Sequence, residues 1–349
     1  MSFLSDDEKD SLTVKRMIFH IVGKSYPQPS ILDEVTPPEY TDFFIDRIKS
    51  ALKGNLFKFR EHSKTEASLR NINKAKKNFV TESEKLVNDF QHWHTTKTSN
   101  GAFFLFELST AVNATVFAII KYDNEDVVRY FLKNNNNSQK PTLERFSENF
   151  VRKADAMQKI ALIKLDKKKG GTLIVCDRSN RTHISGFFEG FLDVQRVNSE
   201  DDLSEKLVDA LKEVFKLHRN LLPENIQKRG VNGIYDTLRQ PGQEFDSENI
   251  EPLVIAIFGP LESASPVRKS LIKSLKNKGI LEETFKINPQ KIKKPTRRKM
   301  MTEEGYEISY DDGMRPEVRD RKDGRKEIIV ITNRITRDDI DTDKDSKRN

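Results

Sequence analysis

The sequence predicts an α+β fold in which mixed antiparallel strands and helices form two packed subdomains. Its length of 349 residues is long for one core and suits two domains. Helical and strand patterns come in runs, without the strict alternation of a parallel βαβ fold. Apolar residues make up 36% and charged residues 33%, so the chain can bury a core under a charged surface. We expect an N-terminal α+β domain over 1–138, a C-terminal α+β domain with a basic surface over 139–337, and a disordered acidic tail over 338–349.

The first elements are a strand and two amphipathic helices. Residues 13–22 are apolar and β-branched, which indicates a strand. Apolar side chains then recur at helical spacing over 40–52, and Gly54 supplies the stop. A second helix is expected to start near Thr81, which forms a capping-box pattern with Glu84.

Four apolar runs predict two antiparallel strand pairs on either side of a polar interruption. The runs 102–108 and 114–122 form the first pair, in the core of the N-terminal half. The runs 158–165 and 172–177 form the second pair, joined by the polar turn DKKKGG. The asparagine tract at 134–138 lies between the pairs and marks a loop or a domain boundary.

The C-terminal half is predicted to hold several helices before the chain returns to strands. A regular amphipathic helix is expected over 201–218, and further helices over 223–240 and 251–259, the last mostly buried. The clearest helix spans 266–278, with Ser265 as its N-cap and a proline in the first position. Two short strands are expected to close the fold, over 305–313 and 326–335.

Cysteine content and the absence of targeting signals favour a reducing, cytosolic setting. Cys176 is the only cysteine, so an intrachain disulfide and a cysteine-only metal site are excluded. It lies in the apolar run TLIVCD, which favours a packed structural thiol over a nucleophile. The acidic N-terminal segment has no apolar stretch typical of a signal peptide. Glu107 and several polar residues interrupt the longest apolar run, so no membrane span is expected.

Residues with catalytic or metal-binding spacing are not found. Gly23-Lys24-Ser25 lacks the first glycine of a phosphate-binding loop and leads into no helix. His92 and His94 would point in different directions on the expected helix and could not share one metal ion. The acid pairs Asp311-Asp312 and Asp338-Asp339 lie in a turn and in the tail, without the spacing of a nuclease site. We therefore expect no enzyme activity, no cofactor and no metal.

The densest charge feature is the segment 286–299, here called the basic strip. It reads KINPQKIKKPTRRK and carries seven Lys or Arg residues and no acid. Pro289 and Pro295 argue against a continuous helix, so we expect the strip to lie extended over a surface. An extended cationic segment complements a phosphate backbone, and seven phosphate contacts would give a log–log salt slope of roughly −6. A solvated basic linker is the alternative.

Two other basic features precede the strip. Lys167, Lys168 and Lys169 form the tip of an expected hairpin, where they can reach phosphates or simply be solvated. Arg178 and Arg181 lie at the end of the following strand and could belong to the same face as this tip. The polar side of the 266–278 helix carries Arg268, Lys269, Lys273, Lys276 and Lys278. The residues expected to bind DNA are Lys291, Lys293, Lys294, Arg297, Arg298, Lys299, Lys167, Lys168, Lys169, Arg268 and Lys269.

Three segments resemble the bacterial nucleoid-associated protein family typified by NdpA/YejK. They are the strand pair SNGAFFLFELSTAVNATVFAIIKYD at 99–123, KIALIKL followed by HISGFFEGFLDV at 159–165 and 183–194, and the closing segments EETFKI, GYEISYDDG and RKEIIVITNRI within 282–335. The resemblance extends from about Thr13 to Ile335. It implies association with DNA at the nucleoid, in the bacterial cytoplasm, without a known catalytic site. The family offers no short ligand motif, so the expected site residues remain those chosen from charge.

Together these patterns predict a nucleoid-associated protein that binds the backbone of double-stranded DNA with little sequence preference. The basic insertion KIKKPTRRK and the acidic tail depart from the family pattern. They keep open an alternative, in which the chain is a DNA-sensing effector or nuclease partner in a phage-defence or mobile-element system. A nucleoid or defence-system protein and a second copy of the chain are further candidate partners.

Overall fold

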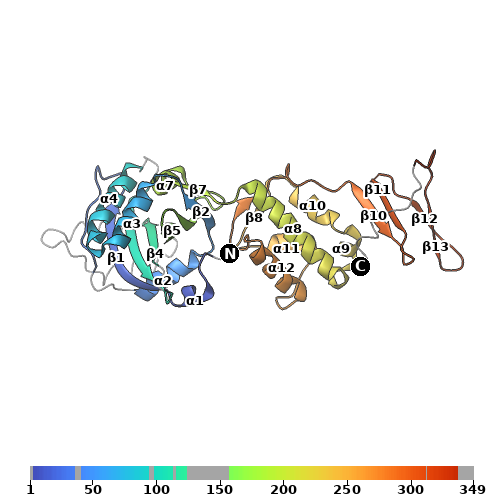
Figure 1. Cartoon of the computed structure of the whole chain (residues 1–349), viewed down its shortest axis with the longest axis horizontal. Helices are drawn as coiled ribbons and strands as arrows, with labels where there is room; N and C mark the ends of the chain where they lie inside the picture. The colour runs from blue at the N-terminus through green and yellow to red at the C-terminus, as the bar shows by residue number, and fades with distance from the viewer. Residues whose placement is uncertain are drawn as a thin grey trace. The chain divides into compact units, whose positions relative to one another are not determined.

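The structure divides into two compact units, residues 1–292 and 293–349, and a seven-stranded antiparallel sheet forms the core of the N-terminal half of the first unit (Figure 1). The computed structural model describes residues 3–35, 41–93, 98–112, 115–123, 157–311 and 313–336. The fold is α+β, as the sequence predicts. The asparagine tract, His94, Asp312 and the acidic tail of the sequence analysis lie outside the described residues.

The strands of the large sheet follow the order β1-β3-β4-β5-β6-β2-β7, and every neighbouring pair is antiparallel. Their bounds are β1 Thr13–Val22, β2 Asn55–Phe59, β3 Gly101–Ser109, β4 Val116–Tyr122, β5 Met157–Leu165, β6 Gly171–Asp177 and β7 Val194–Arg196. Both expected strand pairs are confirmed, since β3 pairs with β4 and β5 pairs with β6. Because β4 also pairs with β5, the sheet continues across the domain boundary expected after residue 138.

The sheet is buried on both faces, which explains why its central strands read as continuous apolar runs. Side chains alternate between faces along a strand. Phe104 and Phe106 of β3 belong to one apolar cluster, while Phe103 and Leu105 belong to the other. A strand that alternated polar and apolar residues would place polar side chains in one of these two clusters.

Short helices cover the two faces. They are α1 Asp6–Asp10, α2 Thr41–Ser50, α3 Lys64–Lys74, the 3-10 turn η1 Lys76–Asn78, α4 Phe79–His92 and α7 Gly186–Leu192. Helix α2 contributes to the first cluster, and α3, α4 and α7 contribute to the second. Helix α4 begins at Phe79, and the expected capping box at Thr81 is not its start; Asn78 at the N-cap makes no side-chain cap bond. Phe79 is fully buried, so packing sets this end of the helix.

Residues 199–292 form a helical half with an apolar cluster of its own, whose buried members all lie between Leu203 and Ile292. Its elements are α8 Glu200–His218, η3 Arg219–Leu221, α9 Glu224–Arg229, α10 Asn232–Leu238, β8 Glu244–Phe245, α11 Glu251–Phe258, α12 Pro266–Asn277 and β9 Phe285–Lys286. Ser199 and Ser265 cap α8 and α12. Helix α11 is less buried than expected, because Ile255 is 47% exposed. We call residues 3–196 the sheet half.

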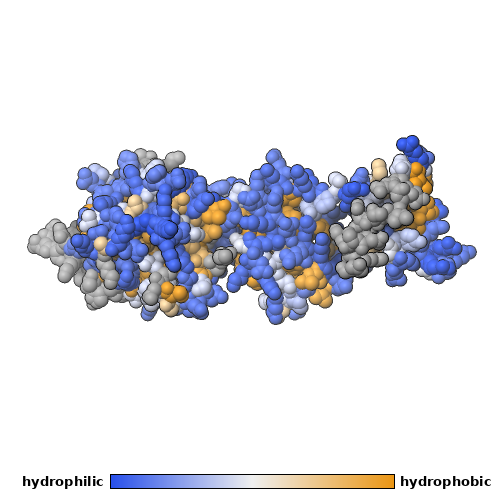
Figure 2. Space-filling model, in the orientation of Figure 1, coloured by the Kyte–Doolittle hydropathy of each residue, from blue (hydrophilic) through white to orange (hydrophobic). Residues whose placement is uncertain are grey.

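The second unit consists of two separate β-hairpins among the described residues. Their strands are β10 Arg297–Met301 with β11 Glu307–Asp311, and β12 Glu317–Asp320 with β13 Lys326–Ile329. The two expected terminal strands are present as β11 and β13. Their partners β10 and β12 were not expected, and β10 is formed by the end of the basic strip. Figure 2 shows that hydrophilic residues cover most of the visible face of the first unit.

Candidate nucleic-acid interface

The first part of the basic strip is anchored to the helical half. Ile287 and Ile292 are buried in its apolar cluster. Lys291 Nζ lies 3.1 Å from Asp201 Oδ2 of α8. The hydrogen bond that Lys291 donates to Asp201 raises the pKa of Lys291 above its ordinary value. Lys291 therefore already has a carboxylate partner, and the strip is not the bare cationic segment that its sequence suggested.

The second part of the strip is β10, whose cations face acids across the hairpin. Arg297 Nε lies 3.9 Å from Asp311 Oδ1, and Lys299 Nζ lies 2.5 Å from Glu307 Oε1. All four side chains remain at least partly exposed, so these pairs are worth little individually. Between the two parts, Lys293 is exposed and Lys294 is half-buried. Lys294 and Arg298 each take part in an interaction of their own.

The lysine tip, Lys167–Lys169, lies exposed at the turn between β5 and β6, as expected. Side chains of helix α3 anchor this turn through hydrogen bonds to its backbone. Gly170 N–H donates to Glu66 Oε1 at 2.6 Å, and Arg70 Nη1 donates to the Asp166 carbonyl at 3.0 Å. Lys169 lies 3.9 Å from Glu61, an exposed pair that solvent weakens. The three ammonium groups therefore extend from a turn that is hydrogen-bonded to α3.

Helix α12 carries the most regular set of exposed cations in the described residues. Lys269, Lys273 and Lys276 are exposed, and we call them the cationic ridge. At 100° per residue they fall within an arc of about 60°, and they are separated by about 6 and 4.5 Å along the axis. No ion pair to these three lysines occurs among the described residues. The residues expected to bind DNA include Lys269 but not Lys273 or Lys276, although all three lie on the same polar side of the helix.

Arg268, on the neighbouring side of α12, has a different role from the one expected. Its guanidinium pairs with Glu251 of α11, and its side chain is only 20% exposed. The pair joins α11 to α12 within the helical half. Arg268 therefore already has a carboxylate partner within the fold, and a DNA phosphate would compete with Glu251 for it.

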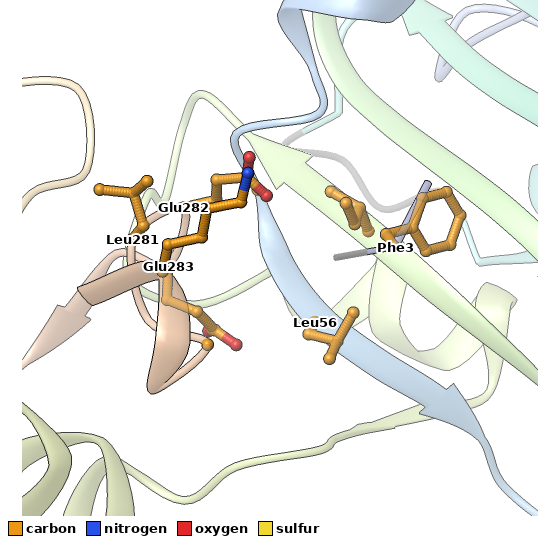
Figure 3. Close-up of a pocket in the computed structure, with 9 residues that line it drawn as sticks. Phe3, Leu56, Leu281, Glu282 and Glu283 are labelled. Atoms are coloured by element: carbon orange, nitrogen blue, oxygen red, sulfur yellow. The ribbon is translucent and has the colours of Figure 1, made fainter. Parts of the chain in front are cut away.

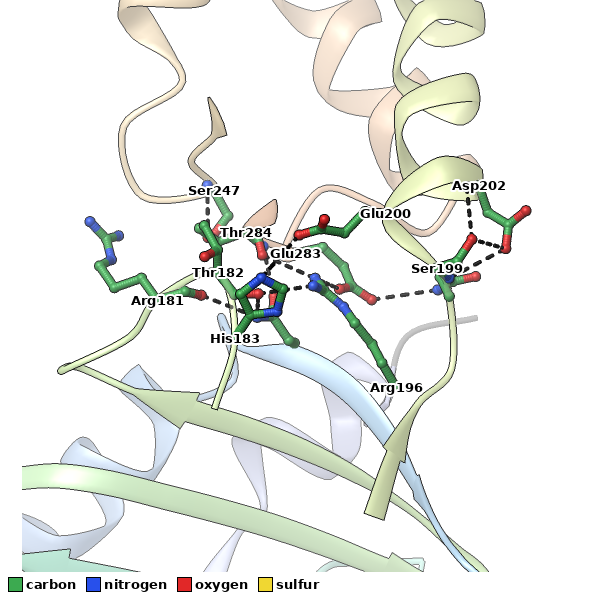
Figure 4. A network of polar contacts seen from close by, with 12 residues as sticks. Arg181, Thr182, His183, Arg196, Ser199, Glu200, Asp202, Ser247, Glu283 and Thr284 are labelled. Atoms are coloured by element: carbon green, nitrogen blue, oxygen red, sulfur yellow. Dashed lines mark hydrogen bonds and ion pairs between the residues drawn. The ribbon is translucent and has the colours of Figure 1, made fainter. Parts of the chain in front are cut away.

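Arg181 belongs to a polar seam between the sheet half and the helical half (Figure 4). Arg181 Nη2 lies 2.8 Å from Asp246 Oδ1 and 2.7 Å from Glu248 Oε2. Arg196 Nη2 donates to Glu283 Oε2 at 2.8 Å, and both side chains are largely buried. These arginines hold the two halves together, so Arg181 does not add to an open basic face.

The same seam contains a small cavity, with Phe3 and Leu56 on the sheet side and Leu281, Glu282 and Glu283 on the other (Figure 3). Its volume of about 60 Å³ is enough for a few water molecules and too small for an organic ligand. A wider, open groove of about 880 Å³ runs between α3 and α4, and its walls mix lysines with acids and amides. Neither hollow gathers charges of one sign, as a nucleic-acid site would.

Reactive groups are not assembled into a catalytic site in the described part of the chain. Burial raises the pKa of the Cys176 thiol, which disfavours the nucleophilic thiolate. No group of three or more His, Cys, Asp or Glu side chains placed to hold a metal occurs among the described residues. The described helices also include none long and apolar enough to cross a membrane.

The described part of the chain is an α+β fold that exposes lysine clusters on α12 and at the β5–β6 turn. Comparison with known proteins assigns the chain to a family. The family model described as nucleoid-associated protein YejK matches residues 18–338, so the chain belongs to the YejK family of nucleoid-associated proteins. No curated protein and no solved structure matches the chain.

Proposed function

We propose that this nucleoid-associated protein binds the backbone of double-stranded DNA through the cationic ridge and the lysine tip, with little sequence preference. The observation that carries the proposal is the ridge: three exposed lysines on one side of α12, with no acid paired to any of them in the described part of the chain. Ammonium groups contact phosphates as point charges, so they fix position without reading bases. The proposed location is the nucleoid in the cytoplasm.

DNA binding by the cationic ridge and the lysine tip would cost less free energy than binding by the strip, because cations of the strip already have acid partners. Phosphate contacts by Lys291, Arg297 or Lys299 would compete with Asp201, Asp311 or Glu307 for the same cation. The ridge and the tip face no such competitor, apart from the weak contact of Lys169 with Glu61. We therefore assign the larger share of the affinity to the ridge and the tip, and a smaller share to the strip, including Lys293, Lys294 and Arg298.

The salt dependence of binding tests this assignment. Each neutralised phosphate contributes about −0.9 to the slope of log K against log salt, so three ridge lysines would contribute about −2.7. Replacing Lys269, Lys273 and Lys276 by Ala should weaken binding to all sequences alike and reduce the slope by that amount. Fluorescence anisotropy with a labelled random-sequence duplex, at several KCl concentrations, measures both quantities.

A matched control removes the same charge elsewhere. Lys64, Lys212 and Lys228 are surface lysines that pair with Asp89, Asp209 and Glu224. Their joint replacement by Ala lowers the net charge equally, and it should leave affinity and slope nearly unchanged. Equal losses in the two triple variants would mean that only total charge matters, and no loss in the ridge variant would overturn the assignment.

Two further expectations remain proposals. A second copy of the chain is expected as a partner, and light scattering of the free protein measures its oligomeric state. The alternative role, as an effector or nuclease partner in a defence system, predicts loss of the duplex when Mg²⁺ is added to the same binding reaction. Intact DNA in Mg²⁺ supports the binding role.

A further inference from the structure

The hairpin of β10 and β11 is an incomplete sheet. In the described residues each strand pairs only with the other, so each has one open edge of backbone N–H and C=O groups. A single two-stranded hairpin is marginally stable in water and gains from a third strand. An open edge of this kind is a template for an added strand.

Cations lie on both faces of β10. Arg297, Lys299 and Met301 lie on one face, opposite Asp311, Ser309 and Glu307 of β11. Arg298 and Met300 lie on the other face, opposite Tyr310 and Ile308, and Met300 is half-buried. The open edge of β10 therefore presents cations along its first part and methionines at its end.

Strand β11 shows which sequence such an edge accepts. It reads Glu-Ile-Ser-Tyr-Asp, so acids on one face alternate with apolar residues on the other. Its acids form the pairs Arg297–Asp311 and Lys299–Glu307 across the hairpin. A strand with the same alternation, added on the open side of β10, would place its acids beside Arg297 and Lys299 and its apolar side chains beside Arg298 and Met300.

We propose that the open edge of β10 binds an extended acidic segment of a partner protein, with acids alternating with apolar residues, as a third strand. Backbone hydrogen bonds supply the affinity, and the side chains of Arg297, Lys299 and Met300 supply the selectivity. The partner is thus recognised by its charge pattern and its extended conformation. This role is independent of the proposed DNA contacts on α12 and at the β5–β6 turn.

The probe for this site is a labelled peptide with the sequence of residues 303–313, EEGYEISYDDG, added to the full-length protein without DNA. Its control is the same peptide with every Glu and Asp replaced by Lys. The acidic peptide should bind at least about tenfold more tightly than the basic one, because each reversed pair turns an attraction into a repulsion. Anisotropy measures both affinities, and hydrogen exchange should show new protection in β10.

A charge-swapped protein keeps the hairpin intact while changing its preference. In the variant Arg297→Glu/Lys299→Glu/Glu307→Lys/Asp311→Lys, opposite charges still face each other between β10 and β11. This variant should prefer the basic peptide, whereas the ridge variant of α12 should still prefer the acidic one. Failure of the acidic peptide to bind, equal binding of both peptides, or an unchanged preference in the swapped variant would overturn the proposal. DNA binding is measured separately, so either proposal can fail without the other.

Discussion

Lys159 and Asp177 lie opposite each other on β5 and β6, with Nζ 2.9 Å from Oδ1 and both side chains buried. The other donors to Asp177 are the backbone N–H and hydroxyl groups of Ser179 and Ser185. Burial alone would raise the pKa of Asp177, but the hydrogen bonds from Ser179 and Lys159 lower it. Because Ser185 is the N-cap of α7, the Asp177 carboxylate links the end of β6 to the N-terminus of α7.

Replacing Asp177 by Asn should destabilise the protein by roughly 3–5 kcal/mol, because it leaves the Lys159 ammonium buried without its counter-charge. Urea denaturation followed by circular dichroism measures the change. Asp246→Asn is the matched control, since it breaks the more exposed pair with Arg181 and should cost less than about 1 kcal/mol. Equal losses of unfolding free energy in the two variants would show that the buried Lys159–Asp177 pair contributes no more to stability than the exposed Arg181–Asp246 pair.

His20 should make the fold sensitive to mild acid. It is fully buried, and burial lowers its pKa from 6.5 to about 4. Leu32 N–H donates to Nδ1 at 3.2 Å and Nε2 lies 3.1 Å from Ser83 Oγ, so the neutral ring fits with Nδ1 as acceptor. The unfolded state binds a proton between the two pKa values and the folded state does not. Stability is therefore complete above pH 6.5 and falls as the pH is lowered towards 4.

The loss at the acid end should reach about 3 kcal/mol from this residue alone. Carboxylates also titrate in this range, so the measurement compares wild type with His20→Gln. The variant should be less stable at neutral pH, and its stability should depend less on pH between 6.5 and 5, where the unfolded chain binds a proton at His20 and the folded chain does not. Parallel stability curves for the two proteins would contradict a neutral, buried His20.

Trp93 packs against the backbone of Gly190 in α7, where a methyl group would lie 2.5 Å from its ring carbon Cζ3. Gly190→Ala should therefore displace the ring and cost about 1–3 kcal/mol through overpacking. Trp93 is the only tryptophan, so its fluorescence reports the displacement as a shift of emission to longer wavelength. Gly186→Ala is the control in the same helix, because nothing lies within 4 Å of the added carbon. Identical spectra of the two variants would contradict the contact.

Local sequence patterns were sufficient for the elements whose burial follows from a regular period. The strands β3, β4, β5 and β6 are mostly apolar, and their neighbours in sequence are also their neighbours in the sheet. Ser265 and the proline after it mark the start of α12 because capping is a local interaction. The family resemblance, carried by apolar segments spread along the chain, is confirmed over residues 18–338.

Charge density in the sequence was a less reliable guide to the site. The basic strip stands out as a run without acids, but Asp201, Glu307 and Asp311 reach its cations from elsewhere in the chain. Arg268 and Arg181 have partners on other elements in the same way. Ion pairs depend on distances between side chains that the order of residues does not contain, so a sequence shows cations but not which of them remain unpaired.

The sequence by itself determined the α+β class, the paired strands, the best-capped helices and the family, since each depends on local period, capping or pattern. Tertiary structure decided that the sheet runs across the interruption near residue 138, because β4 and β5 are hydrogen-bonded partners. It also decided that Lys291, Arg297 and Lys299 of the strip pair with acids, whereas the ridge lysines on α12 have no ion pair among the described residues. The physical reason is the same in both cases: hydrogen bonds and ion pairs between distant segments form only when folding brings their atoms within a few ångströms.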